Sequence, residues 1–406
     1  MNEREYIRDL ARQVRELANS PRMQTLKQEW KQHNALQSPR PMICVSPEGS
    51  WGEILTPKTL LCTDEKLRQY EYTLRQKLYW GNEIQDDTPI SEYFNVPYVT
   101  TVSSYGEGLE ETKDQGENRG SFHYHKLIQD IDEDFHKLRF RQVTYDEEQS
   151  KKNLEEAQEL LGDILTVRHR GAFWWTLGIT SEVIKLIGLE DLMIDMYDCP
   201  ESLHRLMGWF RDEHMNLMDQ YEKLGILSLN NEDDLIASGG IGYTDELPGE
   251  KFDGRVGYEN LWGFAESQET VGISPEMFGE FIFPYQLPLL ERFGINCYGC
   301  CEPVEGRWKW VQQIPRLRRV SVSPWSKKEE MKELLGKEYI FSRKPNPSYV
   351  CNGFAREAIE EELESTMKMA KDLNLEIILK DTHTIEYHPE RFHEWVKMAR
   401  KAADKY

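Results

Sequence analysis

The sequence lacks any long apolar run. No stretch approaches the ~20 consecutive apolar residues that a helix needs to cross a bilayer. The N-terminal segment MNEREYIRDLARQVRELA is charged and has apolar residues at helical spacing, so it does not have the pattern of a signal peptide. We therefore expect no membrane partner, no export, and a cytoplasmic location.

Basic residues are in the minority. The 406 residues include 71 acidic and 50 basic side chains, which give a formal net charge of −21, and no tract is rich in Lys or Arg. DNA, RNA and anionic membranes attract proteins through positively charged surfaces. The charge balance therefore argues against nucleic acids and anionic membranes as partners.

Cysteine is sparse. The chain has seven, an odd number spread over a long sequence, so we expect no disulfide framework. Thiols stay reduced in the cytosol. Three of the seven nevertheless fall within five positions of the segment INCYGCCEPV, at Cys297, Cys300 and Cys301.

Eight short apolar segments alternate with helical patterns along most of the chain. The last four are spaced for helical crossovers, which predicts parallel pairing. An alternation of this kind predicts an α/β fold, namely a (β/α)8 TIM barrel, with an open doubly wound sheet as the alternative. The eight segments are residues 39–47, 93–105, 162–173, 223–234, 294–303, 317–325, 337–347 and 375–384.

The chain divides into a short extension and one large domain. Residues 1–38 have a helical pattern and predict an N-terminal helical extension, and residues 39–406 form the barrel. Residues 106–150 and 235–272 interrupt the alternation. We expect them to be long inserted loops on the working face of the barrel.

Polar and reactive side chains follow the carboxyl ends of the predicted strands, where parallel barrels build their active sites. Aromatic walls suit an aryl or otherwise apolar substrate, although burial in the core is the alternative for these residues. The side chains expected to contact the substrate are Phe173, Trp174, Asn230, Trp262, Tyr298, Trp325 and Arg343.

The cysteine cluster has three competing interpretations. Cys297 is expected to be a small apolar core residue, like the isolated Cys44, Cys62 and Cys199. A redox pair is disfavoured, because the C-x-x-C spacing from Cys297 straddles a strand end and does not open a helix. A metal site needs ligands that converge from separate segments. The candidate ligands are Cys300, Cys301, Glu302 and His383, with Cys351 as a competitor.

Four segments together resemble the uroporphyrinogen decarboxylase superfamily. They are SPEMFGEFIFPY, YGCCEPV, SRKPNP and LKDTHT, and the resemblance covers roughly residue 160 to the end. It implies a (β/α)8 barrel with an N-terminal helical extension. The superfamily includes decarboxylases of haem synthesis and cobalamin-dependent methyltransferases.

The residues favour the methyltransferase branch. The decarboxylases grip the acidic groups of their substrate with arginines after the first strand, whereas the segment here, CVSPEGSWGEI, contains none. The methyltransferases bind zinc through a His-x-Cys motif on the fifth strand and a distant Cys after the eighth. Here Cys300 matches, His383 takes the place of the distant Cys, and Tyr298 stands where the motif has His. Cys301 or Glu302 would then supply the third ligand.

The resemblance implies zinc-dependent transfer of a methyl group from a small donor to Co(I) of a separate corrinoid protein. The aromatic residues favour an aryl methyl ether as the donor. Zinc would act as a Lewis acid, and a side-chain acid would protonate the departing oxygen. No Asp-x-His-x-x-Gly pattern occurs, so the cobalamin would belong to the partner. The candidate acids are Glu266, Glu269, Asp233 and Asp381.

Two alternatives stay open. A metal-free decarboxylase or lyase on the same barrel would act on a small carboxylate with Asp and Arg residues. A non-catalytic protein that binds a small ligand tightly is the second alternative. The sequence leaves the oligomeric state open, and a homodimer is one candidate assembly.

Overall fold

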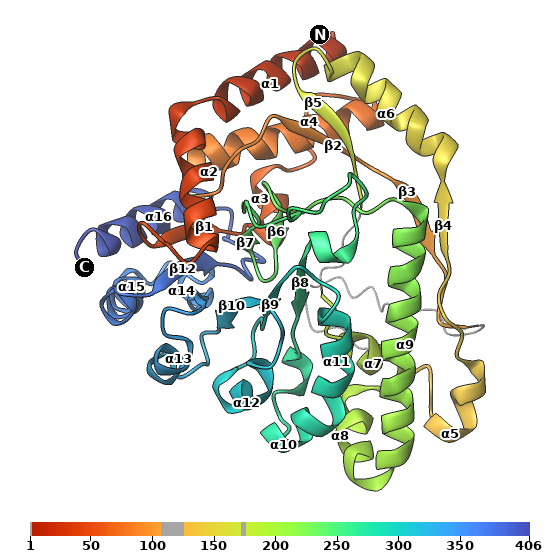
Figure 1. The fold of residues 1–406 in the computed structure, drawn as a ribbon. Helices are drawn as coiled ribbons and strands as arrows, with labels where there is room; N and C mark the ends of the chain where they lie inside the picture. Colours follow the sequence, from red (N-terminus) through yellow and green to blue (C-terminus); the bar gives the residue numbers. More distant parts are fainter. Residues whose placement is uncertain (1, 107–125, 172–175) are drawn as a thin grey trace.

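The structure is a computed structural model that describes residues 2–106, 126–171 and 176–406. Figure 1 shows a central sheet with helices packed around it, and the N-terminal helices lie across the top of the view. No helix in the described part of the chain combines the length and the apolar character needed to cross a membrane. Phe173 and Trp174 lie outside the described residues.

The central sheet has six strands in the order β1-β12-β11-β10-β9-β8, and every neighbouring pair is parallel. Nearly all of its residues are buried, as expected for a parallel sheet that is covered on both faces. The strands are β1 (Met42–Val45), β8 (Trp262–Ala265), β9 (Ile295–Tyr298), β10 (Leu317–Val322), β11 (Ile340–Arg343) and β12 (Asn374–Leu379).

Six further strands in the described residues form three separate pairs. β2 pairs in parallel with β5, whereas β3 with β4 and β6 with β7 are antiparallel. Their bounds are β2 (Tyr93–Pro97), β3 (Val99–Val102), β4 (Val143–Asp146), β5 (Thr166–Arg170), β6 (Leu235–Ile236) and β7 (Gly240–Ile241).

Helices connect the strands, and α11, α13 and α16 pack against the central sheet. The long helix α9 runs beside α11 along one flank, as Figure 1 shows. The helices are α1 (Glu3–Ala18), α2 (Pro21–Asn34), α3 (Trp51–Ile54), α4 (Glu65–Tyr79), α5 (Ile131–Asp134), α6 (Glu147–Leu161), α7 (Thr180–Ile187), α8 (Leu189–Asp198), α9 (Pro200–Leu224), α10 (Pro275–Met277), α11 (Phe283–Leu290), α12 (Trp308–Val311), α13 (Lys328–Leu335), α14 (Ser348–Cys351), α15 (Arg356–Ala370) and α16 (Glu390–Ala403).

Helices α1 and α2 occupy the predicted N-terminal extension. The side chain of Asn2 caps α1 and that of Ser20 caps α2, which also has Pro21 at its first turn. α1 packs against α4 and α6 through its apolar face. α2 ends with two buried polar residues, His33 and Asn34, which contact the sheet and its neighbouring hairpin.

A buried polar network ties α2 to the central sheet. Arg319 on β10 donates to both carboxylate oxygens of Glu376 on β12, from Nε at 2.8 Å and from Nη2 at 3.1 Å. His33 lies 3.1 Å from Glu376 Oε2, and the hydroxyl of Ser342 on β11 donates to Oε1. Each group is fully or almost fully buried, so the charges depend on one another for their stability.

The hairpin of β6 and β7 covers the Arg319 side chain. A Cβ atom at Gly240 would stand 2.6 Å from the guanidinium carbon of Arg319, so only glycine fits this position without displacing the side chain. Asn34 completes the contact, because its amide accepts from Arg319 Nη2 at 2.7 Å and donates to the carbonyls of Ile241 and Tyr243.

The strand predictions are confirmed for β1, β2, β5, β9, β10, β11 and β12, and the predictions are wrong at three places. The described part of the segment 106–150, which was predicted to be a loop, contains α5 and β4. Residues 226–230 form no strand, although they belong to the predicted fourth one. The strand β8 lies instead within the segment 235–272 that was predicted to be a loop. Asn230 explains why residues 226–230 do not pair with β8 as a strand. Its side-chain amide forms hydrogen bonds with the backbone N–H and C=O of Trp262, which the backbone of a neighbouring strand would otherwise form.

The ladder of the central sheet ends at β1 on one side and at β8 on the other. Next to β1, the carboxylates of Asp86 and Asp87 accept from the backbone N–H groups of Val45 and Ile43. Side chains therefore take the place of a further strand at both edges. The hydrogen bonds of the described residues establish an α/β fold with a parallel sheet, and a closed eight-stranded ring stays a prediction.

Replacement of Glu376 by Gln should destabilise the protein by about 3–5 kcal/mol, because it leaves the buried Arg319 without its counter-charge. Burial acts to raise the pKa of Glu376, but the Arg319 charge and the His33 hydrogen bond outweigh burial and hold this pKa below its usual 4.5. The stabilisation is therefore present above pH 4.5 and lost as the pH falls through the lower folded-state pKa.

Urea unfolding of Glu376→Gln and the wild type at several pH values measures both effects. Glu364→Gln, which changes an exposed partner of Lys405, is the matched control and should shift the free energy of unfolding by less than about 0.5 kcal/mol. Equal stability of Glu376→Gln and the wild type at pH 7 would show that the network does not stabilise the fold.

Candidate functional site

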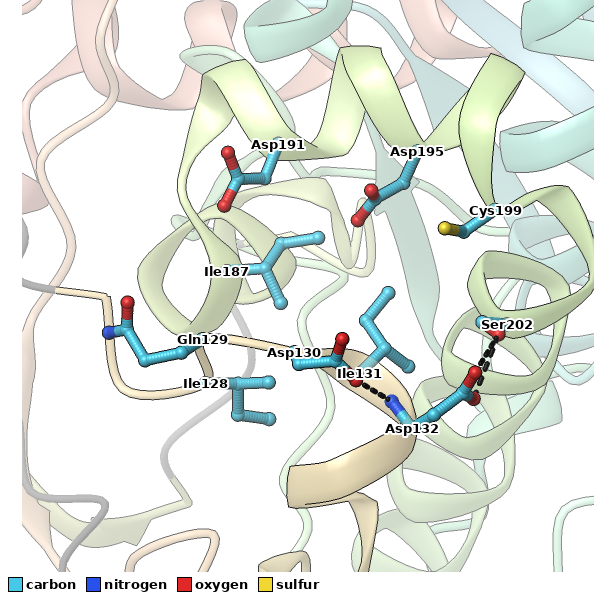
Figure 2. Close-up of a pocket in the computed structure, with 10 residues that line it drawn as sticks. All are labelled: Ile128, Gln129, Asp130, Ile131, Asp132, Ile187, Asp191, Asp195, Cys199 and Ser202. Atoms are coloured by element: carbon cyan, nitrogen blue, oxygen red, sulfur yellow. Dashed lines mark hydrogen bonds between the residues drawn. The ribbon is translucent and has the colours of Figure 1, made fainter.

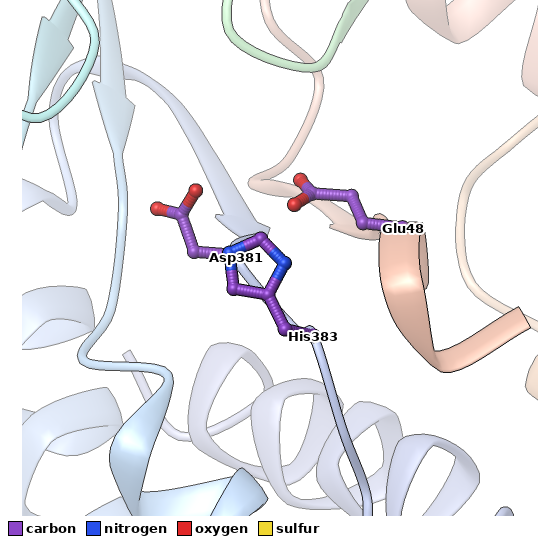
Figure 3. A group of neighbouring side chains, drawn as sticks. All are labelled: Glu48, Asp381 and His383. Carbon is purple, nitrogen blue, oxygen red and sulfur yellow. The ribbon is translucent and has the colours of Figure 1, made fainter. Parts of the chain in front are cut away.

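Three side chains that could bind a metal meet at the carboxyl edge of the central sheet. Glu48 follows β1, whereas Asp381 and His383 follow β12. One potential ligand atom from each lies within 4.8 Å of those of the other two. Figure 3 shows Asp381 and His383 on one segment and Glu48 on the facing helical turn.

The backbone brings these two segments close together. Glu48 and Asp381 both have a positive φ, at 43° and 58°, a conformation that non-glycine residues rarely adopt. A Cβ atom at Gly49 would stand 3.0 Å from the carbonyl oxygen of His383, so a side chain at this position would crowd the backbone of the facing loop. Strained backbone of this kind persists where surrounding contacts hold it, and it is concentrated at functional sites.

Hydrogen bonds hold the two loops in register. The backbone N–H of Ser50 donates to the carbonyl of Thr382 at 3.0 Å, and the Thr382 hydroxyl donates to the carbonyl of Ser46 at 2.6 Å. Glu53 reinforces this junction by accepting from the Thr384 hydroxyl at 2.6 Å. The geometry of Glu48, Asp381 and His383 is therefore fixed by contacts outside the group itself.

The two adjacent cysteines lie beside this group, at the end of β9. Their Sγ atoms are 3.6 Å apart, and Cys301 Sγ is also 3.6 Å from Asp381 Oδ2. Cys300 is buried and contacts the Ser238 hydroxyl at 3.4 Å, whereas Cys301 is half-buried. Cys301 and Asp381 thus connect the thiol pair to the group that contains His383.

Lys380 places a positive charge between the thiols and the carboxylate. Its Nζ lies 3.7 Å from each Sγ atom and 2.6 and 2.7 Å from the two carboxylate oxygens of Asp381. Burial acts to lower the pKa of Lys380, but the neighbouring thiols and Asp381 outweigh it and raise this pKa. Lys380 is therefore a cation at this edge.

The thiol pair has divergent acidities. The contact with Cys301 and the charge of Lys380 lower the pKa of Cys300 to about 7 against the opposing effect of burial. The pKa of Cys301 is raised by its contact with Cys300 and by burial. One thiolate can form easily in this pair, and the second forms only with difficulty.

Glu302, a predicted ligand, holds the turn after β9. It is fully buried, and its two carboxylate oxygens accept from the backbone N–H groups of Ser267 at 2.8 Å and Cys300 at 2.9 Å. Among the described residues it is not part of the group that could hold a metal. The contacts show Glu302 fixing the backbone that carries Cys300.

Glu266 is a buried carboxyl group at the end of β8. Its Oε2 accepts from the backbone N–H of Gln268 at 2.8 Å, and its buried Oε1 has no hydrogen-bond partner in the described structure. Burial, together with the charges of Glu269 and Glu302, raises the pKa of Glu266 to about 9. Glu266 therefore carries a proton at neutral pH, as a general acid must.

The other candidate acids differ in their surroundings. Glu269 accepts from the Thr180 hydroxyl at 2.8 Å and lies close enough to Glu266 to influence its charge. Asp233 accepts from the Ser91 hydroxyl and lies 3.6 Å from Arg168 on β5, so its described contacts tie it to the β2–β5 pair. Asp381 is the candidate acid that belongs to the thiol and histidine cluster.

Most residues predicted to contact substrate are engaged in structural contacts. Asn230 and Trp262 pair at the edge of the sheet, and the buried Tyr298 hydroxyl contacts Gln286 at 3.3 Å. Arg343 is buried and pairs with Glu362 on α15 at 3.0 Å. Trp325 is the exception, because 70% of its surface is exposed in the loop after β10.

Among the other cysteines, Cys44, Cys62 and Cys297 are buried, as predicted, and Cys199 is exposed, so its prediction as a core residue was wrong. Cys199 directly precedes α9 and is exposed at this junction.

Sequence reasoning missed two residues of the site. Glu48 lies in the segment that follows β1, so its position after a strand was a usable signal. Lys380 directly precedes Asp381, and only the fold reveals that its ammonium lies between the thiols and the carboxylate.

A separate hollow lies among α5, α7, α8 and α9, away from the sheet edge (Figure 2). Three of its four carboxylates have structural roles: Asp130 caps α5, Asp132 contacts Ser202 and Arg205, and Asp191 pairs with Lys126. The sheet edge combines thiols, imidazole, carboxylates and a buried acid, so its chemistry makes it the better candidate site.

No family model matches the sequence, and no curated protein matches it either. Among solved structures, the fold is similar to that of a methyltransferase from Methanosarcina mazei, with a TM-score of 0.51 and 13% sequence identity. The match covers 94% of this chain and 98% of that one. At this identity the likeness establishes a shared fold over almost the whole length.

The Glu266→Gln variant should be more stable than the wild type at pH 8, by at least about 1 kcal/mol. The folded protein holds the Glu266 proton up to about pH 9, whereas the unfolded chain releases it near 4.5, so this group lowers stability as the pH rises between these values. A neutral Gln removes the effect, and the difference should shrink towards pH 5.

Denaturant unfolding at pH 5, 6, 7 and 8 tests this, with the exposed Glu276→Gln as the control. A Glu266→Gln variant that is less stable than the wild type at pH 8 would contradict a protonated Glu266.

Proposed function

We propose that this chain is a zinc-dependent methyltransferase of the uroporphyrinogen decarboxylase-like type, which moves a methyl group from a small donor to Co(I) of a separate corrinoid protein. The observation that carries the proposal is the meeting of Glu48, Asp381 and His383 beside a thiol pair at the carboxyl edge of a parallel sheet. The likeness in fold to the methyltransferase from Methanosarcina mazei supports a methyltransferase activity.

The residues fit a zinc ion. Zinc takes imidazole nitrogen, carboxylate oxygen and thiolate sulfur, and this edge offers all three types. We assign His383, Asp381 and Glu48 as the main candidates, with Cys301 and Cys300 next to them. Bound zinc would supply Lewis acidity toward the oxygen that carries the methyl group of the donor. For Asp381 to serve as a ligand, its carboxylate has to exchange its contact with Lys380 for the metal.

Glu266 is assigned as the proton donor. When the bond between the methyl carbon and the donor oxygen breaks, the electron pair stays on oxygen, and the Glu266 carboxyl group supplies the proton that this oxygen takes. A buried carboxyl group with a raised pKa holds that proton ready at neutral pH. Burial also keeps bulk water from competing for the proton.

The loops at this edge have surfaces suited to a protein partner. Val271, Trp325 and Tyr387 follow β8, β10 and β12 and are exposed by 57%, 70% and 72%. Large exposed apolar side chains around a site are typical of interaction surfaces. They support docking of the corrinoid protein over the sheet edge, with the cobalamin carried by that partner.

A metal-free decarboxylase or lyase is the second candidate, and Lys380 is the observation that favours it. The Lys380 ammonium contacts both thiols and already balances the charge of Asp381 without a metal. In that case Lys380 itself would stabilise the negative charge that develops on a small carboxylate substrate.

The zinc proposal predicts one tightly held zinc ion per chain, which His383→Ala should weaken by at least about tenfold because an imidazole ligand is lost. Metal analysis after dialysis, with competition by a chromophoric chelator, measures the affinity. His388→Ala is the matched control, because His388 is exposed nearby and pairs with Glu390 outside the cluster. A zinc affinity that is the same in His383→Ala and the wild type would contradict the assigned site.

Methyl transfer should fall by about 100-fold or more in Glu266→Gln with the zinc content unchanged, because the departing oxygen loses its proton donor. Methylation of free Co(I) cobalamin by an aryl methyl ether, followed by the absorbance of the cobalamin, measures the rate. Glu276→Gln should keep the wild-type rate. Carbon dioxide release from a small carboxylate, unaffected by zinc removal, would instead support the second candidate.

A further inference from the structure

Lys344 is a buried cation that has no role in the cluster described above. It directly follows β11, and only 2% of its surface is exposed. Its Nζ donates to the hydroxyl of Ser342 and lies 3.3 Å from the Ser342 carbonyl oxygen. Within the described residues, no carboxylate oxygen forms an ion pair with it.

Three other buried cations near the sheet have such a partner, whereas Arg307, which follows β9, donates to the carbonyls of Ser267 and Thr270. Arg319 pairs with Glu376, Lys380 with Asp381, and Arg343 with Glu362. An ammonium has three N–H donors, and Ser342 supplies the two acceptors that the described structure shows for Lys344. The Glu376 carboxylate shares the Ser342 hydroxyl with Lys344, but its ion pair is with Arg319. A buried charge without a direct ion-pair partner is costly, so an anion that enters from outside would relieve it.

Lys344 faces the side of the sheet on which the cluster lies. Residues two apart on a strand point to the same face, and Ser342 points toward Glu376 in the buried polar network. Lys344 is therefore one layer closer to the carboxyl edge than that network. Consistent with this position, the charges of Lys380 and Cys300 act on its ammonium.

We propose that Lys344 binds a carboxylate group of the small-molecule substrate, at the inner end of the site whose outer end holds Asp381 and His383. One positive charge without an ion-pair partner matches one negative charge, because the buried cations Arg319, Arg343 and Lys380 pair with carboxylates of the protein. A monovalent carboxylate therefore suits the site better than a phosphate, which would need further cations. This inference rests on the proposed function for the rest of the substrate, a methyl ether.

The protonation state of Lys344 agrees with this role. Burial lowers its pKa to about 8, against the opposing charge of Glu376. Most of the Lys344 side chains are therefore charged at pH 7, and a bound carboxylate would raise the charged fraction further.

Binding of two probes tests the proposal. 4-Methoxybenzoate and 4-methoxybenzyl alcohol share the ring and the methyl ether and differ in charge, and calorimetry at pH 7 gives their dissociation constants. The wild type should bind the carboxylate at least tenfold more tightly than the alcohol. Lys344→Met should lose this preference and keep its affinity for the alcohol. Lys77→Met is the control, because Lys77 donates to the carbonyls of Ser91 and Tyr93.

Several results would overturn the proposal. They are equal affinity of the wild type for the two probes, no carboxylate binding up to the solubility limit, and an unchanged preference in Lys344→Met. Inorganic phosphate that binds more tightly than the carboxylate, and only when Lys344 is present, would also overturn it. Both titrations are run with and without zinc, so failure of the zinc proposal leaves the carboxylate preference measurable.

Discussion

The carboxylate of Glu376 is the point on which the rest of the structure depends. It joins β10 through Arg319, β11 through Ser342 and α2 through His33, and each of these groups is buried. A buried charge tolerates few arrangements, because any that leaves it unpaired is costly. This network therefore sets the register of three neighbouring strands and attaches the N-terminal helices to them.

The geometry of the candidate site depends on the strand register that the Glu376 network sets. β11 and β10 separate β12 from β9 in the sheet, yet Asp381 and Cys301, which follow these two strands, lie 3.6 Å apart. Glu302 and the hydrogen bonds around Thr382 then fix the loops that carry the reactive groups. The interior thus has a structural layer at Glu376 and a chemical layer at the carboxyl edge, with Lys344 between them.

Much of this architecture could be predicted from the sequence. The length and spacing of the apolar segments predicted β1 and β9 to β12, and polar residues indicated the carboxyl ends of these strands. The strand β8 was missed because its four residues, WGFA, lie within a segment rich in loop signals. Residues 226–230 were predicted to be a strand because they are apolar, but Asn230 bonds to β8 through its side chain.

The site could be predicted only in part, for a physical reason. Sequence spacing indicated that Cys300 and His383 follow strands, yet a sequence gives no spatial distance between residues 83 positions apart. Glu48 and Lys380 enter the cluster through the packing of β1 against β12, a contact that a sequence does not display. Likewise, the raised pKa of Glu266 comes from burial that only the fold creates.

A crystal structure of the protein grown with zinc, with data collected on both sides of the zinc absorption edge, tests the central claim most directly. The account predicts one strong anomalous peak bounded by His383, Asp381 and Glu48, on the side facing Cys301. A peak elsewhere, or Lys380 still bound to Asp381 with no peak at this edge, would contradict it.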